Sequence, residues 1–335
     1  MNRTNPAETK LLICVWHPFT FWRPQTVMPQ TIRARWPDMR VVHLPDYDLL
    51  AQELPDTDIF VGYSLRAEQL THAKKLKWIH STAAGVAQLM YPELRDSGIV
   101  VTNPSGVFSP PMAEHTMGLL LALARNFPDS TRHQDRSHWG QQDIWDKPQR
   151  LTELSSQVLL IVGFGSIGRE LAKRVRAFEM RVWGVTRSGK GDTTHAEKIL
   201  PAQQLEEALP HADYVVLAAP ETADTRHLIG AAQIARMKPG ARLINVGRGS
   251  LLDEAALIRA LETGALGGAA LDVTSVEPLP PDSPLWKTPN LLITPHTSAV
   301  SDRLWHRETA LLMDLLERWF DGREMFNQVD FARGY

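Results

Sequence analysis

Short apolar runs alternate with helix-like stretches along most of the chain, and this alternation constrains the fold more than any other feature. Five such runs precede residue 103: Leu11–Val15, Val41–Leu44, Ile59–Val61, Trp78–Ser81 and Val100–Thr102. Six more follow residue 155: Val158–Val162, Arg181–Val185, Tyr214–Ala218, Arg242–Val246, Gly268–Leu271 and Leu291–Thr294. Nearly continuous apolar strands between helices are typical of parallel sheets covered on both faces. We therefore expect an α/β protein with two doubly wound parallel sheets.

Two longer apolar segments predict substantial helices. Pro110-Pro111 opens one that runs through Met112–Ala124, and Ser301–Phe320 forms the other, with Gly322 placed to end it. The first segment is apolar on all sides, which predicts burial either inside a domain or at a subunit interface. We expect a homodimer.

The charge balance and the cysteine count exclude several classes of protein. Lys and Arg number 36 against 38 Asp and Glu, so the formal net charge of -2 provides no field to attract nucleic acid or an anionic membrane. The single Cys14 lies in an apolar run, where we expect a buried side chain without a disulfide or a metal. No apolar run near the N-terminus approaches a signal-peptide core or the ~18 residues of a membrane span. These features predict a cytoplasmic protein.

The run Val158–Val162 is followed by the pattern G-x-G-x-x-G and then by helix-forming residues. Gly163 permits a tight turn, Gly165 lets a pyrophosphate approach the backbone, and Gly168 lets helix and strand pack closely. Ser166-Ile167 begins the helix, whose N-terminus favours negative charge. A strand, this spacing and a helix in this order predict a dinucleotide-binding site.

The end of the next strand bears on the choice of nicotinamide cofactor. An NAD-binding protein usually has Asp or Glu about twenty residues past the third glycine, to bind the ribose hydroxyls. This chain has Thr186-Arg187-Ser188 there. Arg187 is suited to pair with a 2′-phosphate, to which Thr186 and Ser188 would donate hydrogen bonds. A solvated arginine at a strand end is the alternative. The pattern favours NADP(H), with NAD(H) as the second choice.

Three later motifs lie at or beside the ends of predicted strands: Gly247-Arg248-Gly249, Glu277-Pro278 and Pro295-His296. Together with the glycine pattern, their order and spacing closely resemble those of the D-isomer-specific 2-hydroxyacid dehydrogenases, in the branch similar to glyoxylate and hydroxypyruvate reductases. The resemblance extends from about Trp78 to Val329 and is only architectural before that. It implies a flavodoxin-like substrate domain over residues 1–102, completed by 298–335, and a Rossmann dinucleotide-binding domain over residues 103–297. Hinges for domain closure are expected near residues 103 and 297.

The resemblance implies that Arg248, Glu277 and His296 form the catalytic set, and the chemistry explains the residue types. A guanidinium is suited to bind the carboxylate and polarise the carbonyl of a 2-oxo acid. An imidazolium with a pKa near the working pH is suited to protonate the carbonyl oxygen as hydride arrives. A carboxylate on the other ring nitrogen would orient the histidine and raise its pKa.

The same resemblance implies a set of cofactor contacts. The groove would be lined by Ala219, Pro220, Thr225, Val246, Gly247, Arg248 and His296. Asp272 would accept a hydrogen bond from the nicotinamide carboxamide, although a buried structural carboxylate is the competing interpretation.

The motifs say less about which residues bind the substrate. Ala84 and Gly85 lie in a loop similar to the one whose backbone amides receive the substrate carboxylate, beside Arg248 and His296. Val86-Ala87-Gln88 follows them, where the family often has Asp or Asn, and this departure weakens any substrate assignment. Similarity to related reductases suggests that Trp139 covers the pocket of a neighbouring subunit, and the sequence leaves open whether it does so.

Other side chains follow predicted strands and would either face the substrate or pack against one another: Trp16, His17, Phe19 and Tyr63–Leu65. Glyoxylate, hydroxypyruvate and larger apolar 2-oxo acids therefore all stay open as substrates.

The sequence thus predicts an NADP(H)-dependent D-2-hydroxyacid dehydrogenase that reduces a small 2-oxo acid. Glu277 argues against a formate dehydrogenase, because that branch carries Gln at this place and needs no proton donor. The alternative is a dinucleotide-responsive binding module similar to the corepressors of the same fold.

Overall fold

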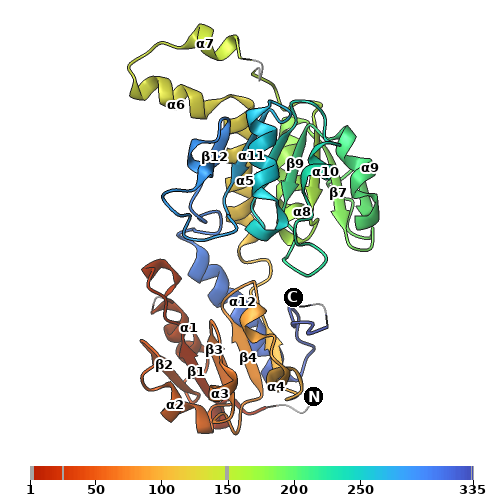
Figure 1. Ribbon diagram of the computed structural model, residues 1–335. Helices are drawn as coiled ribbons and strands as arrows, with labels where there is room; N and C mark the ends of the chain where they lie inside the picture. The colour runs from red at the N-terminus through yellow and green to blue at the C-terminus, as the bar shows by residue number, and fades with distance from the viewer. Residues whose placement is uncertain (1–3, 25, 148–150, 333, 335) are drawn as a thin grey trace. The chain divides into compact units, whose positions relative to one another are not determined.

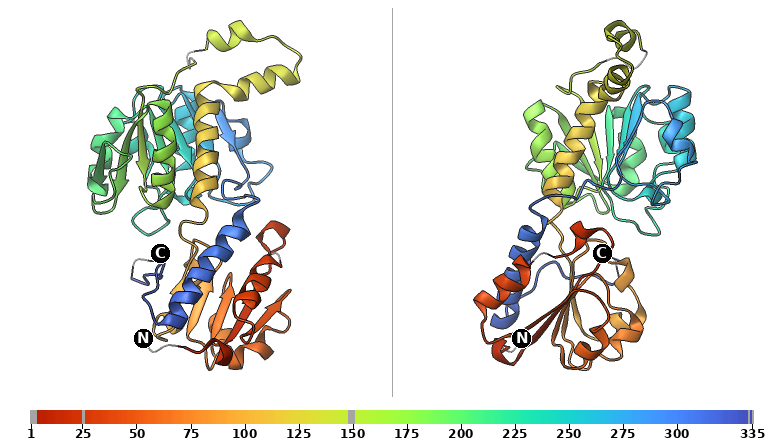
Figure 2. Two further views of the ribbon diagram at one scale, coloured as in Figure 1. Left: turned by 180° about the vertical axis from the view of Figure 1, so that it is seen from behind. Right: turned by 90° about the vertical axis from the view of Figure 1, so that its left-hand side faces the viewer.

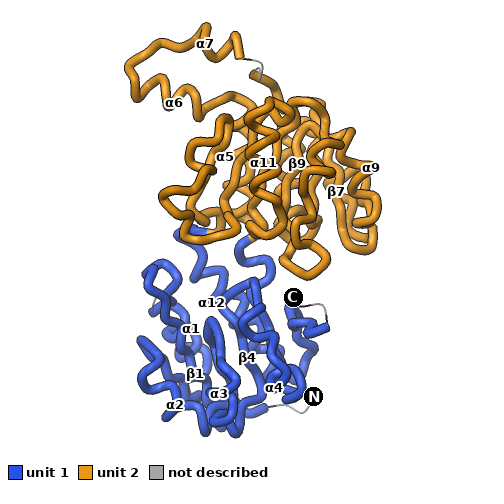
Figure 3. The backbone as a smooth tube through the Cα atoms, viewed as in Figure 1, with its two compact units in different colours: residues 1–108, 300–335 blue, residues 109–299 orange. Residues whose placement is uncertain are grey.

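The computed structural model describes residues 4–24, 26–147, 151–332 and 334. The chain forms two compact units, shown in Figure 3: unit 1 consists of residues 1–108 and 300–335, and unit 2 of residues 109–299. Each unit is built on one sheet of parallel strands, with helices on both faces (Figures 1 and 2). The predicted α/β class with two parallel sheets is therefore confirmed.

The sheet of unit 1 has the order β2-β1-β3-β4-β5. Its strands are β1 (Lys10–Cys14), β2 (Arg40–Leu44), β3 (Ile59–Gly62), β4 (Trp78–Ser81) and β5 (Val100–Thr102). Chain order reverses between the neighbours β1 and β3, as it does in flavodoxin-like sheets. All five strands lie within about two residues of the apolar runs that predict them.

Helices cover both faces of this sheet. On one face lie α1 (Val27–Arg35) and α12 (Leu304–Asp321), and on the other lie α2 (Leu50–Glu53), α3 (Ala67–Leu70) and α4 (Pro92–Arg95) (Figures 1 and 2). Alternate residues of each strand therefore face different cores. Cys14 belongs to the core on the side of α2 to α4 and is fully buried, as expected, and this burial raises the pKa of its thiol to about 12. Gly322 ends α12 with φ of 67°, as its position predicts.

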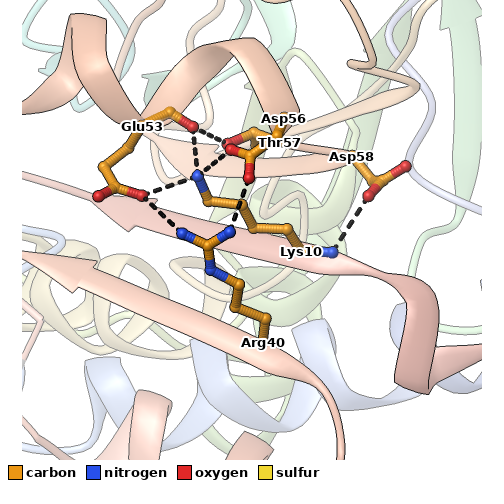
Figure 4. A network of polar contacts seen from close by, with 6 residues as sticks. All are labelled: Lys10, Arg40, Glu53, Asp56, Thr57 and Asp58. Atoms are coloured by element: carbon orange, nitrogen blue, oxygen red, sulfur yellow. Dashed lines mark hydrogen bonds and ion pairs between the residues drawn. The ribbon is translucent and has the colours of Figure 1, made fainter.

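An ionic network holds the edge of the unit 1 sheet where β1 and β3 begin (Figure 4). The Lys10 ammonium is almost fully buried, and it contacts the Glu53 carboxylate at 2.7 Å, the Glu53 carbonyl oxygen and the carboxylate of Asp56. Arg40 contacts the same Asp56 carboxylate at 2.6 Å. Asp58 accepts a hydrogen bond from the Lys10 backbone N–H at 3.1 Å. The network fastens the segment that precedes β3 to the first residue of β1.

The sheet of unit 2 has the order β12-β11-β10-β9-β6-β7-β8. Its strands are β6 (Val158–Val162), β7 (Arg181–Thr186), β8 (Lys198–Pro201), β9 (Tyr214–Leu217), β10 (Arg242–Asn245), β11 (Gly268–Leu271) and β12 (Leu291–Ile293). No apolar run in the sequence predicts β8, because this strand lies at the edge of the sheet beside β7 and none of its residues is buried. Chain order reverses between β6 and β9, and the carboxyl ends of both strands carry predicted cofactor residues.

Two helices lie on one face of the unit 2 sheet, α5 (Ser109–Ala124) and α8 (Ser166–Val175). The other face is covered by α9 (Leu205–Ala208), α10 (Ala231–Ile234) and α11 (Glu254–Glu262) (Figures 1 and 2). Short 3₁₀ helices span Pro6–Glu8, Thr20–Trp22, Leu54–Asp56, Ala87–Leu89, Arg176–Phe178, Ala202–Gln204, Leu209–His211, Gly249–Leu251 and Pro284–Lys287.

The helix predicted after Pro110-Pro111 is α5, and most of it is buried against α8, β10 and β11. Beyond it, α6 (Phe127–Asp135) and α7 (Gln141–Trp145) extend away from the sheet of unit 2 (Figure 1). We call residues 126–147 the arm. Among the described residues, no helix is both long and apolar enough to cross a membrane.

Candidate active site

The glycine turn joins β6 to α8 in unit 2. Gly163 has φ of 95°, and a Cβ there would lie 2.4 Å from the Ala219 backbone nitrogen, so only glycine fits. A Cβ on Gly168 would approach the Gly163 carbonyl oxygen to 3.0 Å, which confirms close packing of helix and strand. Gly165, by contrast, faces open space, and no side chain caps the N-terminus of α8. The N–H groups of Ser166 and Ile167, which no described side chain caps, therefore suit an anionic ligand.

The residues after β7 leave a positive charge available beside this turn. Arg187 and Ser188 are exposed, and Arg187 forms no hydrogen bond or ion pair with any described residue. The Thr186 hydroxyl donates a hydrogen bond to the Lys190 carbonyl oxygen at 3.1 Å, which closes the loop. The acidic residue nearest in sequence, Asp192, accepts hydrogen bonds from Thr194 instead. The local charge therefore suits a phosphate better than a ribose diol.

The loops that follow β9 and β10 pack against each other at the same edge of the sheet. A Cβ on Gly247 would lie 2.9 Å from the Ala219 carbonyl oxygen, so Gly247 permits this close approach. The Thr225 hydroxyl donates to the Pro220 carbonyl oxygen at 2.8 Å and fixes the loop after β9. Val246 is fully buried, whereas Pro220 is exposed.

The Asn245 side chain, which no sequence motif singles out, fixes the backbone around Arg248. The Asn245 amide donates to the Arg248 carbonyl oxygen at 2.8 Å, and its oxygen accepts from the Gly247 N–H at 3.0 Å. Gly249 lets this loop pack against the backbone of Thr274, which a Cβ would approach to 2.1 Å. Arg248 itself is half-buried, and its Nη1 donates to the Gly247 carbonyl oxygen at 2.7 Å.

Glu277 and His296, which are 19 positions apart in the chain, form a direct pair. Glu277 Oε2 lies 2.7 Å from His296 Nδ1, and Glu277 Oε1 accepts from the Thr274 N–H at 3.0 Å. The backbone of His296 is in the left-handed region at φ of 52°, and its N–H donates to the Asp272 carbonyl oxygen at 2.9 Å. No described residue bonds to Nε2 of the ring.

The contact between the two side chains raises the pKa of His296 and lowers that of Glu277, so the charged form of each group is favoured. The hydrogen bond that His296 Nδ1 donates to the Glu277 carboxylate raises the pKa of His296 above its ordinary value. Burial opposes this rise, and the negative charges of Glu277 and Asp272 add to it. The nearby Arg248 charge works in the opposite direction on the same pKa. Burial alone would raise the pKa of Glu277, but the hydrogen bonds from His296 and Thr274 hold it below its ordinary value. Both shifts favour the charged forms, the imidazolium of His296 and the carboxylate of Glu277.

Asp272 is buried and fully engaged by neighbouring loops. Its Oδ1 accepts from the Thr294 hydroxyl at 2.6 Å and from the Thr297 N–H at 3.0 Å, and its Oδ2 accepts from the Ser298 N–H at 3.1 Å. His115 on α5 contacts the same Thr294 hydroxyl at 3.0 Å and was not singled out by the sequence analysis. This geometry gives Asp272 the structural role of the competing interpretation, and its contact to a carboxamide stays a prediction.

The other predicted substrate residues lie in unit 1. Ala84 and Gly85 are exposed in the loop after β4, and the Asn103 amide donates to the Ala84 carbonyl oxygen at 3.1 Å. Trp16 and Phe19 follow β1 and Tyr63 follows β3, all exposed, whereas Leu65 is fully buried.

The arm carries two features of its own. Trp139 is 89% exposed, the most of any large apolar side chain described. His133, His138 and Asp143 offer possible metal-ligand atoms within 4.8 Å of one another, although the sequence analysis expects no metal. His138 Nε2 and Asp143 Oδ2 lie 2.6 Å apart, so two of these three residues already contact each other.

The comparison with protein families decides the assignment. The family model for the D-isomer specific 2-hydroxyacid dehydrogenase, NAD binding domain, matches residues 117–298, more than half of the chain. The chain belongs to the D-isomer specific 2-hydroxyacid dehydrogenases. The predicted family and its class, NAD(P)-dependent oxidoreductases acting on 2-hydroxy acids, are therefore confirmed.

Curated members of the family cover most of this dehydrogenase. A D-3-phosphoglycerate dehydrogenase of Methanocaldococcus jannaschii is 33% identical over 284 residues, 84% of this chain and 53% of that protein. The chain thus spans about half the length of that relative. A glyoxylate reductase of Korarchaeum cryptofilum is 33% identical over 278 residues, 81% of this chain and 82% of that protein.

Solved structures of the family share both sheets. A D-isomer specific 2-hydroxyacid dehydrogenase family protein from Aeromonas salmonicida is 34% identical, with a TM-score of 0.82 over 97% of this chain and 99% of that one. An NADPH-dependent glyoxylate/hydroxypyruvate reductase from Sinorhizobium meliloti, in complex with NADP and sulfate, is 25% identical, with a TM-score of 0.81 over 98% and 100% of the two chains.

Proposed function

We propose that this dehydrogenase reduces a 2-oxo acid to its D-2-hydroxy acid with NADP(H), and that His296 donates the proton. The observation that carries the proposal is the 2.7 Å contact between Glu277 Oε2 and His296 Nδ1. Glu277 fixes the ring and favours its protonated form, and Nε2 is left to give a proton to an alkoxide oxygen. A histidine with a purely structural role would not need one ring nitrogen held by a carboxylate and the other left without a partner among the described residues.

Arg248 supplies the positive charge that a 2-oxo acid requires. Its loop is fixed by Asn245 and by the close packing of Gly249, so the guanidinium is held in place before a substrate arrives. A planar guanidinium binds a carboxylate and stabilises negative charge that develops on an adjacent oxygen. Its charge also lowers the pKa of His296, against the rise that Glu277 causes, and a lower pKa favours release of the proton.

The residues of unit 2 fit a nicotinamide dinucleotide, which supplies the hydride when it is bound. The open side of Gly165 and the uncapped N-terminus of α8 would receive the pyrophosphate. Arg187, with no partner among the described residues, would pair with a 2′-phosphate, which supports NADP(H) over NAD(H). The relative from Sinorhizobium meliloti is named as NADPH-dependent and is consistent with this preference. The ratio of kcat/KM for NADPH to that for NADH tests it, and a clear preference for NADH would refute it.

The arm supports a homodimer as the working form. Phe127, Trp139 and Trp145 on the arm are all more than half exposed, and exposed aromatic residues of this kind mark interaction surfaces. We infer that the arm contacts a second copy of the chain and that Trp139 reaches the partner's substrate site.

The deciding experiment follows NADPH oxidation with a panel of 2-oxo acids for the wild-type protein and for His296→Ala. The variant should still bind NADPH but lose about 10² to 10⁴ in turnover, the usual contribution of general acid catalysis. His72→Ala removes an exposed histidine of unit 1 and serves as the matched control, with turnover unchanged. Near wild-type turnover of folded His296→Ala would refute the proton-donor assignment.

The same panel discriminates the alternative of a binding module. If wild-type protein binds NADPH but turns over no 2-oxo acid, the cofactor acts as a signal and the reductase proposal fails.

A further inference from the structure

Three possible metal ligands meet where the arm turns from α6 into α7. His133, His138 and Asp143 each offer one ligand atom, and these three atoms all lie within 4.8 Å of one another. Among the described residues, no other group of three or more His, Cys, Asp or Glu side chains brings its ligand atoms this close together. All three residues belong to unit 2, so the cluster is complete within one compact unit.

The backbone of the turn brings these residues together. The His138 N–H donates to the His133 carbonyl oxygen at 2.9 Å, and Ser137 has the left-handed conformation at φ of 52°. Gly140 packs directly against the His133 ring, because a Cβ at this position would lie 2.6 Å from a ring atom. The turn therefore holds the two histidines close to each other without any ion.

A structural role explains two of the three side chains but not the third. His138 Nε2 contacts Asp143 Oδ2 at 2.6 Å, and this pair is sufficient to close the turn. The ring of His133 lies 5.1 Å from that of His138, centre to centre. Neither nitrogen of the His133 ring forms a hydrogen bond with a described residue. Its nitrogen atoms are therefore available to a ligand.

The charges around the cluster are compatible with a bound cation. Arg132 and Lys147 both form ion pairs with the buried carboxylate of Asp129, which offsets part of their charge. Arg136 is exposed and forms no ion pair with a described residue, so its charge opposes a cation but is screened by water and salt. Asp143 brings a negative charge into the cluster itself.

The ligand set is suited to a divalent transition metal. Imidazole nitrogen and carboxylate oxygen both bind Zn²⁺, at ~2.0 to 2.2 Å. Tetrahedral coordination at this distance places the ligand atoms ~3.3 Å apart. Ligand atoms already within 4.8 Å of one another reach this spacing by rotation of side chains on a fixed backbone. Three protein ligands leave the fourth position to a water molecule.

We propose that His133, His138 and Asp143 form a Zn²⁺ site that fixes the turn of the arm. The sequence predicts no metal, because the ligands are brought together by the turn and not by a recognisable motif. The bound ion links the end of α6 to α7 and thereby restrains Trp139, which lies between two of the ligands in the chain. The proposal concerns binding by the arm alone and does not depend on the reductase function.

Isothermal titration of the full-length protein, without an affinity tag, with ZnCl₂ tests the site. Wild-type protein should bind one Zn²⁺ per chain. His133→Ala should weaken this binding by at least about 10- to 100-fold, because loss of a group that merely orients a ligand already has an effect of that size. Asp143→Asn should weaken it as well. His72→Ala is the matched control, because it removes an exposed histidine of unit 1 and should bind Zn²⁺ as wild type does.

Trypsin cleavage after Arg136 reports whether the ion fixes the turn. Zn²⁺ should slow this cleavage in wild-type protein, because bound ligand opposes local opening, and should not slow it in His133→Ala. Without metal, His133→Ala should be cleaved at the wild-type rate, because the contact between His138 and Asp143 remains.

Three outcomes would overturn the site. One is that Zn²⁺ binds to wild-type protein only at millimolar concentration or not at all. Another is that His133→Ala and Asp143→Asn both bind Zn²⁺ as tightly as wild type, which would place the ion elsewhere. The third is that saturating Zn²⁺ leaves the cleavage rate of wild-type protein unchanged, because the ion would then not fix the turn.

Discussion

At the scale of single residues, the proposed role of His296 as proton donor predicts that Glu277 sets the pH range of the reaction. The raised pKa of His296 depends first on the hydrogen bond that its ring donates to Glu277, so Glu277→Gln should lower that pKa toward or below its ordinary value. With His296 as the proposed proton donor, reduction should require the protonated ring and should fail as the pH rises through this pKa. The alkaline limb of the kcat/KM profile for reduction should therefore move to lower pH in the variant.

The pH profile separates this positioning role from a merely structural one. Glu262→Gln, at an exposed position at the end of α11, makes the same chemical change and should leave the profile in place. A Glu277→Gln variant with lower activity but an unmoved alkaline limb would show that Glu277 does not control the proton on His296. In the oxidation direction the neutral ring is needed, so the acid limb should move to lower pH as well.

Residue identity in the candidate site was predictable where a motif fixes it. Gly163 and Gly168 have the close contacts that their spacing predicts, and Glu277 and His296 meet as expected. His115 and Asn245 were missed for a physical reason. The partner of His115, Thr294, lies 179 positions away in the chain, and no periodicity connects them. Asn245 bonds the backbone of Gly247 and Arg248 through its side-chain amide, and an asparagine at the end of a strand is too common to indicate this role from the sequence.

At the scale of elements, the ionic network at the start of β1 is a stability device. Lys10→Met removes a cation whose side chain is only 5% exposed and leaves the Glu53 carbonyl and two carboxylates without it. We expect a loss of about 1 to 3 kcal/mol in the free energy of unfolding, the cost of stranding partly buried acceptors. Urea unfolding of the full-length variant and of the wild-type protein measures this change in the free energy of unfolding.

Lys77→Met provides the comparison within the same network. The Lys77 side chain is 56% exposed, so its ion pair with Asp58 should contribute only about 0 to 1 kcal/mol. Equal destabilisation by the two substitutions would contradict the assignment of the network's strength to burial at Lys10.

Buried strands could be predicted from the sequence, whereas an exposed edge strand could not. β6 coincides with its predicted run because both faces of the strand are covered and every residue must be apolar. β8 has Lys198 and Pro201 at its ends and lies at an edge, where polar residues are tolerated, so no apolar run marks it. The helices of the arm are also not marked by an apolar pattern in the sequence, because they do not pack on the sheet of their own unit.

At the scale of the whole molecule, the arm should make two chains act together. Light scattering should give a mass near twice the 37.6 kDa of one chain. If Trp139 reaches the partner's substrate site, each catalytic set depends on an arm that belongs to the other chain. Trp139→Ala should then raise KM for the 2-oxo acid while leaving NADPH binding unchanged.

Mixed dimers test this dependence directly. Subunits with His296→Ala lack the proton donor but keep a normal arm, and subunits with Trp139→Ala keep the catalytic set but lack the normal arm. In a mixed dimer, the intact catalytic set of the second subunit receives Trp139 from the first, so a fraction of sites should regain the wild-type KM. A mixture that shows only the KM of Trp139→Ala would mean that Trp139 serves its own chain or no active site at all. Mixing His296→Ala with His72→Ala subunits gives the reference for subunit exchange, because every active site there should keep the wild-type KM at any ratio.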